Sequence, residues 1–280
     1  MNIIGLGKAG CKIAELFKEH PQYKVFLLDS EDKHKRRKNC FNIPQHNSAE
    51  LYDANPIDLT KLIGSLDDDE EVYFIVCGSG KISACSLWIL RELREKKVNI
   101  VYIKPDSSTL DRKSILRNKA HFHILQEYSR SGVFDRILIF DNNCMSDIIG
   151  KTSILNFYPK INQLVATSIH WFNIYTNSEP IFDTFREKYI SSRIGTLSIV
   201  NIDKSQIINC YDMVDDNQIE YFFGVNRIRI ENDEELFDKL TSISSQDSEE
   251  KSISFGVYPT ELDEGFSFAL RTSSEIQKEV

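Results

Sequence analysis

The sequence lacks several features that would assign a protein to a class at once. No apolar run approaches the length of a membrane-spanning helix, and the first residues are typical of a folded strand rather than a secretion signal. The six cysteines are scattered, without a C-x-x-C pair or the spacing of a metal site or disulfide framework. There is no internal repeat, complete Walker A motif or nucleophile elbow. We therefore expect a soluble, cytoplasmic protein with free thiols, no metal site and no membrane insertion.

The sequence also has fewer cationic than anionic side chains. The 280 residues include 34 Lys and Arg against 42 Asp and Glu, which gives a net charge of −8. This balance disfavours a general nucleic-acid binder, because such proteins carry an excess of cationic side chains. The basic cluster at residues 33–38 is more typical of a solvated surface than of a phosphate contact. A hydrophobic content of 41% is ordinary for a globular protein, and the length suits one large domain or two modest ones.

The start of the chain is its most informative segment. A short apolar strand at residues 2–4 leads into a G-x-G-x-x-G turn, and apolar residues at helical spacing follow. Such glycines let backbone N–H groups approach an anion, and the helix N-terminus adds a partial positive charge. The turn, which contains Gly5, Gly7, Lys8 and Gly10, therefore predicts a nucleotide site. The pattern suits a dinucleotide fold and a GTP-binding fold equally, and a tight turn without a ligand remains open.

Predicted strands and helices alternate through the first half of the chain. Strands are expected over residues 24–29, 72–77, 98–103 and 135–140, and helices over residues 82–94 and 113–131. Because the strands are apolar throughout and alternate with helices, they predict a parallel sheet that is covered on both faces.

The second half begins with a long predicted helix over residues 152–175. Pro159 favours a regular helix that starts near this residue, with the proline in its first turn. A further helix is expected over residues 233–242 with Asn232 as its N-cap, followed by a loop over 242–251. Strands are expected over residues 196–202, 221–225, 252–258 and 265–270.

These elements predict an α/β protein in which a Rossmann-like parallel-sheet nucleotide domain is joined by a long central helix to a smaller α+β domain. The nucleotide domain is expected over residues 1–151 and the connecting helix over 152–177. A catalytic-loop-like segment over 178–195 and the α+β domain over 196–280 complete the predicted organisation.

The order of these elements resembles the tubulin/FtsZ family of GTP-dependent cytoskeletal proteins. In that family a first Gly-rich loop follows the first strand, and a second one wraps the GTP phosphates. Gly78, Ser79, Gly80 and Lys81 stand in the second position here, in a shorter loop with fewer glycines. The resemblance implies that this loop contacts phosphate, with Lys81 supplying positive charge in place of the missing glycines.

The resemblance also implies contacts to the base and sugar. Asn162 falls where the family has an Asn in its central helix that reads the guanine edge, and an exposed helical residue is the alternative. Asp111 matches the acid that contacts the sugar, with Asp106 as its competitor. Asp29 lies where a dinucleotide fold would hold a ribose hydroxyl. For all three aspartates, an ordinary turn residue remains open.

The family's catalytic loop follows the central helix and acts on GTP held by the neighbouring subunit. Asp183 matches the first Asp of that loop, Arg186 replaces the second, and Ile181 replaces its Asn. One carboxylate can still polarise a water molecule, but the loss of its partner leaves hydrolysis open. Arg186 suggests either a phosphate contact across an interface or a surface ion pair.

The resemblance therefore implies a reduced tubulin/FtsZ-like protein that binds GTP, with Mg²⁺ left open, and assembles head to tail with copies of itself. The absence of a long tail after residue 271 favours a divergent filament protein over a housekeeping division protein. Two alternatives stay open. One is a Rossmann-type dinucleotide-binding oxidoreductase or nucleotide-activating enzyme. The other is a tubulin-like assembly or regulatory module that does not hydrolyse GTP.

Overall fold

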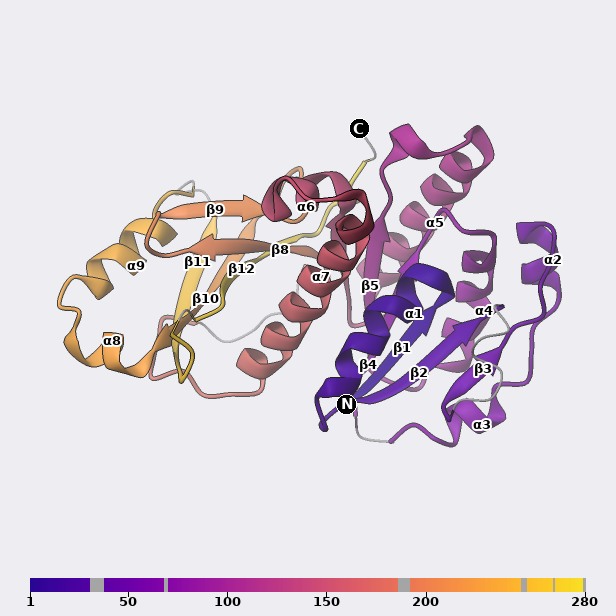
Figure 1. Ribbon diagram of the computed structural model, residues 1–280, viewed down its shortest axis with the longest axis horizontal. Coiled ribbons are helices and arrows are strands. Elements are labelled where there is room, and N and C mark those ends of the chain that lie inside the picture. Colours follow the sequence, from indigo (N-terminus) through magenta and orange to yellow (C-terminus); the bar gives the residue numbers. More distant parts are fainter. Residues whose placement is uncertain (31–37, 68–69, 186–191, 248–250, 264, 279–280) are drawn as a thin grey trace.

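A computed structural model describes residues 1–30, 38–67, 70–185, 192–247, 251–263 and 265–278 (Figure 1). Its strands are β1 (Asn2–Leu6), β2 (Lys24–Asp29), β3 (Cys40–Asn42), β4 (Val72–Cys77), β5 (Val98–Lys104), β6 (Arg136–Asp141), β7 (Phe182–Asp183), β8 (Ile194–Asn201), β9 (Gln206–Asn209), β10 (Gln218–Asn226), β11 (Ser252–Thr260) and β12 (Ser267–Ser273). They form one sheet in the order β3-β2-β1-β4-β5-β6-β8-β12-β10-β11-β7, with β9 paired to β8. Arg186 and residues 33–37 of the basic cluster lie outside the described residues.

Helices cover this sheet on both faces (Figure 1). The α-helices are α1 (Gly7–Leu16), α2 (Ala49–Ala54), α3 (Thr60–Ile63), α4 (Ser86–Glu92), α5 (Arg112–Arg130), α6 (Asn142–Ile149), α7 (Ile154–Thr176), α8 (Arg227–Asn232) and α9 (Leu236–Ser244). Short 3₁₀ helices are η1 (Phe17–Glu19), η3 (Lys81–Cys85) and η4 (Ser107–Thr109). No helix in the described ranges combines the length and apolar character needed to cross a membrane.

The first half is the expected parallel sheet. β1 pairs in parallel with β2 and β4, and β4, β5 and β6 continue in parallel. Successive side chains of each strand enter two different cores: Ile75 packs with α1 and α7, whereas Phe74 and Val76 pack with α4 and α5. This explains why these strands are apolar throughout, and the predicted α/β architecture is confirmed.

The central helix α7 starts earlier than expected. It begins at Ile154, five residues before Pro159, so the prediction of a start near the proline is wrong. Proline removes one N–H donor, and the acceptor left over is the carbonyl of Leu155, in the helix's first turn. Leu155 is 83% exposed, so water can satisfy that carbonyl and the helix tolerates the proline.

The second half is a mixed sheet that continues the first. β8, β12 and β10 are antiparallel neighbours, and β11 joins β10 in parallel. α7 covers one face, where Phe172 and Tyr175 pack against Phe268, and α9 covers the other. β6 and β8 pair in parallel, and the Asp141 N–H donates to the Cys210 carbonyl at 2.7 Å. Backbone hydrogen bonds therefore join the two halves alongside α7.

Two predicted helices have different boundaries. Asn232 is the last residue of α8 and does not cap the next helix, whose N-cap is Glu235. Asn226 caps α8 by accepting from the Ile228 N–H at 2.8 Å. α9 then runs to Ser244, into the predicted loop at 242–251. The helix expected over 82–94 begins as the 3₁₀ helix η3 and becomes α-helical only at Ser86.

Candidate functional site

The first glycine loop, residues 5–10, joins β1 to α1. A Cβ at Gly5 would overlap the carbonyl oxygen of Gly10, and a Cβ at Gly10 would overlap the carbonyl oxygen of Ile75. Gly7 has a φ of +69° and is the first residue of α1. These glycines let α1 pack directly on β1 and β4. The first turn of α1, with N–H groups that lack helical partners, therefore lies at the carboxyl end of the sheet.

The second glycine loop, residues 78–81, follows β4 at the same end of the sheet. A Cβ at Gly78 would overlap the Tyr102 hydroxyl, whereas a Cβ at Gly80 would meet only Ile82 Cγ2, at 3.8 Å. The same methyl group would lie 2.8 Å from a Cβ at Gly7. Ile82 therefore packs against both glycine loops and holds them side by side.

Two lysines accompany these loops. Lys8 follows the first residue of α1, and Lys81 ends the second loop. Both side chains are exposed, and neither forms an ion pair with another residue of the described ranges. With the N–H groups of the first turn of α1, they make this end of the sheet rich in positive charge and hydrogen-bond donors. Such a combination favours an anionic ligand.

Arg117 in α5 fixes the second loop, and the sequence analysis missed it. Its Nε and Nη2 atoms donate to the Ser79 carbonyl at 3.2 and 3.1 Å, and Nη2 also donates to the Ser114 hydroxyl at 2.7 Å. The Ser79 hydroxyl in turn lies 3.5 Å from the Cys77 thiol. The loop's conformation is therefore held by a side chain 38 residues away in the sequence.

The two candidate sugar-contacting acids both cap helices. Asp111 accepts from the Ser114 N–H at 2.9 Å at the start of α5, and this bond lowers the pKa of its carboxyl. Asp106 accepts from the Ser108 N–H at 2.9 Å, and hydrogen bonds with Ser108 lower its pKa as well. Asp111 and Lys81 line one open cleft of about 770 Å³ beside the second loop. The structure thus brings Asp111 and Lys81 together, and Asp106 is not among the residues lining that cleft.

A buried ion pair joins the ends of β5 and β6. Lys104 and Asp141 are paired at 2.6 Å, with side chains only 12% and 6% exposed. The other Asp141 oxygen accepts from the Asn143 N–H at 2.8 Å and caps α6. Next to it, the side-chain oxygen of Asn142 is inaccessible and has no hydrogen-bond partner in the described part of the chain. Because this oxygen is inaccessible, a ligand could contact it only if the residues that cover it moved.

Asn162 lies in the first half of α7, between residues that pack on the same sheet face as α1. Its neighbour Ile161 is 1% exposed, while Asn162 itself is half-buried and hydrogen-bonds to no other side chain in the ranges that we describe. Asp29 at the end of β2 is 3% exposed and accepts from the Ser30 N–H at 2.8 Å. Asn162 is thus open to a further partner, whereas Asp29 is engaged in a buried strand-end turn.

The predicted catalytic residue lies at the opposite end of α7. Asp183 belongs to β7, pairs with Gly256 of β11, and accepts from the Phe185 N–H at 3.1 Å. Its side chain is exposed. The 23 residues of α7 span roughly 34 Å at 1.5 Å per residue. One chain therefore does not bring Asp183 and the glycine loops together.

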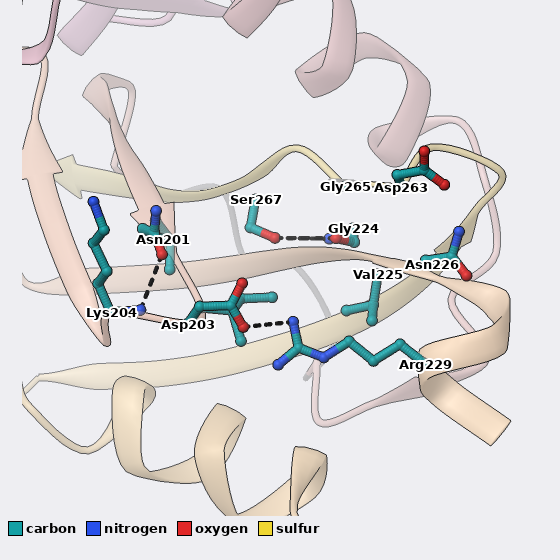
Figure 2. Close-up of a pocket in the computed structure, with 12 residues that line it drawn as sticks. Asn201, Asp203, Lys204, Gly224, Val225, Asn226, Arg229, Asp263, Gly265 and Ser267 are labelled. Atoms are coloured by element: carbon teal, nitrogen blue, oxygen red, sulfur yellow. Dashed lines mark hydrogen bonds and ion pairs between the residues drawn. The ribbon is translucent and has the colours of Figure 1, made fainter. Parts of the chain in front are cut away.

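A separate polar hollow of about 390 Å³ lies in the second half of the chain (Figure 2). It is formed by the β8–β9 turn, the end of β10, α8 and the start of β12. Figure 2 shows the ion pair between Asp203 and Arg229, at 2.8 Å, across its centre. None of the predicted site residues lines this hollow, which is distinct from the glycine loops.

No protein-family model and no curated protein sequence matches this chain. Solved structures do match. An empty FtsZ dimer from M. jannaschii superposes with a TM-score of 0.73 at 10% identity, covering 97% of this chain and 87% of that one. A GTPγS-bound protofilament of CetZ2 from Haloferax volcanii gives 0.73 at 16%, covering 97% and 93%. A GTPγS-form protofilament of TubZ from Bacillus thuringiensis serovar israelensis gives 0.68 at 12%, covering 98% and 86%. The chain has the tubulin/FtsZ fold.

The tubulin/FtsZ fold confirms the resemblance drawn from the order of the motifs. The identities of 10–16% establish the fold alone, so residue roles must be argued from this chain. The residues at the carboxyl end of the parallel strands fit a nucleoside triphosphate. The exposed Lys8 and Lys81 and the first turn of α1 offer cationic and N–H groups for phosphate, and the half-buried Asn162 amide is open to a base.

Proposed function

We propose that this protein binds GTP at the carboxyl ends of β1, β4, β5 and β6 and assembles head to tail into filaments. The observation that carries the proposal is the contact of the two glycine loops through Ile82. It aligns the first turn of α1 with Lys8 and Lys81, so that a polyphosphate meets N–H donors and two cations at once.

Guanine is the base that the remaining polar groups suit. Its Watson–Crick edge presents N–H donors at N1 and N2, which require oxygen acceptors. Asn162 supplies such an oxygen from an amide that has no side-chain partner in the described residues. An adenine ring would present its amino donor in a different position, and we expect the site to select against it.

Self-assembly is supported by exposed apolar residues at both ends of α7. Ile154 and Leu155 are 90% and 83% exposed at its start, and Ile181 and Phe182 are 56% and 43% exposed just beyond its end. Large apolar side chains this exposed mark interaction surfaces in soluble proteins. Because the two groups lie at opposite ends of one helix, a contact between them repeats along a line and gives an open filament.

Such a contact would bring Asp183 of one copy towards the glycine loops of the next. An exposed carboxylate can orient or activate water, but Arg186 stands where the family's second Asp would be in the sequence. We therefore propose slow GTP hydrolysis at the junction between copies. A module that assembles without hydrolysis is the second candidate, which the Arg at position 186 favours.

The first experiment measures nucleotide binding by the purified protein with GTP, ATP and NAD⁺. We expect the affinity for GTP to exceed that for ATP and NAD⁺ by about tenfold or more. Lys81→Ala should lower the affinity for GTP, whereas the matched variant Lys61→Ala, on α3, should leave it unchanged. A preference for NAD⁺, or no binding at all, would overturn the nucleotide proposal.

The second experiment follows assembly by right-angle light scattering together with phosphate release. Scattering that rises with GTP and later decays indicates a filament that hydrolyses GTP, and Asp183→Ala should then make the signal persist. Stable scattering without phosphate release identifies the non-hydrolysing module. A chain that stays monomeric with every nucleotide refutes head-to-tail assembly.

A further inference from the structure

A basic cleft lies beside the second glycine loop. We use this name for the hollow of about 770 Å³ between α2 and the start of α5 that contains Lys81, Arg112, Lys113 and Arg117. Lys81, Arg112 and Lys113 form no ion pair with another described residue. Leu116, 58% exposed, contributes apolar surface to its lining. The cleft also contains Glu50 and Asp111, so four cations face two anions.

An acidic face lies at the other end of the molecule, around the ends of α7, β10 and β11. The Asn226 side chain at the end of β10 donates to the Leu262 carbonyl at 3.0 Å, which joins α8 to the turn after β11. The Ile181 N–H donates to the Val257 carbonyl at 2.9 Å, which joins the segment after α7 to β11. Exposed acids at this end include Glu179, Asp183, Glu231, Glu234, Glu261 and Asp263, while the neighbouring Glu235 is paired with Lys239 at 3.2 Å.

The acidic carboxylates are almost entirely uncompensated. In the described ranges only Glu261 among the six forms an ion pair, with Arg227 at 3.6 Å, and both of those side chains are exposed. Leu262, 45% exposed, lies between Glu261 and Asp263. Like the basic cleft, the acidic face thus places charged groups around an exposed leucine, as the polar rim of an interface surrounds its apolar centre.

The two surfaces cannot meet within one chain. Figure 1 places α2 and α8 at opposite ends of the long axis of the molecule. A chain with net charge −8 would be expected to repel its own copies, yet here cations gather at one end and anions at the other. Opposite charge at opposite ends favours one relative orientation of two copies, in which the ends alternate.

We infer that the basic cleft of one copy binds the acidic turn Glu261-Leu262-Asp263 of the next copy, so that charge polarity orients the subunits. This inference rests on the proposed head-to-tail assembly and identifies the surface that selects its direction. The attraction acts over about 10 Å at 0.1 M salt and only about 3 Å at 1 M, so it should steer association most strongly at low salt.

The test uses two charge-reversed variants. Arg112→Glu with Lys113→Glu gives the cleft the same negative charge as the turn, and Glu261→Lys with Asp263→Lys gives the turn the same positive charge as the cleft. Each variant alone should form at least about tenfold less sedimentable polymer than the unmodified chain at low salt. A 1:1 mixture should restore it, because each acidic end then meets a basic end.

The controls separate this inference from the proposed function. Arg91→Glu with Arg94→Glu reverses two exposed charges on and just after α4 and should assemble normally. All variants should keep their melting temperature, since the altered side chains are exposed, and the Glu261/Asp263 and Arg91/Arg94 variants should keep their GTP affinity. The Arg112/Lys113 variant is assayed at saturating GTP, because its cleft also contains Lys81 and Asp111. Two results would refute charge orientation and leave assembly standing. In the first, the unmodified chain and both reversed variants assemble. In the second, the unmodified chain assembles but the 1:1 mixture of variants does not. If the unmodified chain never assembles, both fail.

Discussion

The buried pair between Lys104 and Asp141 gives the sharpest prediction about stability. With side chains 12% and 6% exposed and a separation of 2.6 Å, the pair is shielded from water on nearly all sides. Removing one partner leaves the other charge buried and uncompensated, which typically costs about 3–5 kcal/mol. Lys104→Met should therefore lower the free energy of unfolding by about 4 kcal/mol, because Asp141 is the more buried partner.

The double variant should be more stable than the Lys104→Met single variant. Asp141→Asn removes the charge but retains a good N-cap, since an asparagine oxygen can still accept from the Asn143 N–H. With Lys104→Met and Asp141→Asn together, no buried charge remains. We expect the double variant to recover about 2 kcal/mol relative to Lys104→Met, a coupling within the range seen for contacting residues.

Urea unfolding followed by tryptophan fluorescence and by circular dichroism supplies the measurement, and coincident transitions would justify a two-state analysis. Lys24→Met is the matched control, because Lys24 and Asp67 are paired at 3.2 Å with side chains 41% and 54% exposed. That change should cost about 0–1 kcal/mol. If Lys104→Met costs no more than the control, the pair is solvated and the reasoning is refuted.

Three other changes probe packing, protonation and the second loop. Gly224→Ala should destabilise by about 1–3 kcal/mol in thermal unfolding, because its Cβ would overlap the Tyr175 hydroxyl; an unchanged melting temperature would contradict this. Burial, helped by the nearby His20, lowers the pKa of His170 to about 4. In the unfolded chain the His170 imidazole takes up a proton near pH 6.5. The free energy of unfolding should therefore decrease as the pH is lowered from about 6.5 towards 4, and His170→Gln should flatten this pH dependence. Gly80→Ala should preserve the melting temperature but reduce GTP affinity about tenfold, measured by fluorescent-nucleotide titration, and unchanged affinity would remove the loop from the site.

Most of the first half of the fold was predictable because β1, β2, β4, β5 and β6 are buried on both faces, whereas β3, which is partly exposed, was not predicted. A segment such as residues 72–77 is apolar at every position, so its strand is recognisable without any alternation. Pro159 misled the prediction for α7 because a proline removes the hydrogen bond to the carbonyl four residues earlier, and here that carbonyl belongs to the exposed first turn, where water can replace the bond. α2 and α3, with six and four residues, are too short to produce a helical period.

Parts of the candidate site could be predicted only where their residues are contiguous. The two glycine loops are local motifs that directly follow strands, and the sequence analysis found both. Lys104 and Asp141 are 37 residues apart and meet because β5 and β6 pair in a register that sets them opposite each other. Arg117 reaches Ser79 only through the packing of α5 beside the second loop. No single-sequence pattern encodes those registers, so neither contact could be predicted.

The glycine motif itself is weaker support for a nucleotide than its pattern suggests. Gly5, Gly10 and Gly78 are required because a Cβ would overlap neighbouring atoms of the protein, and Gly7 adopts a positive φ. These four would be needed to pack α1 and β4 even in a relative that binds nothing. Gly80 differs, because its Cβ direction is open apart from the Ile82 methyl group at 3.8 Å. The nucleotide proposal therefore depends less on the G-x-G-x-x-G pattern than on Gly80 and the two exposed lysines, Lys8 and Lys81.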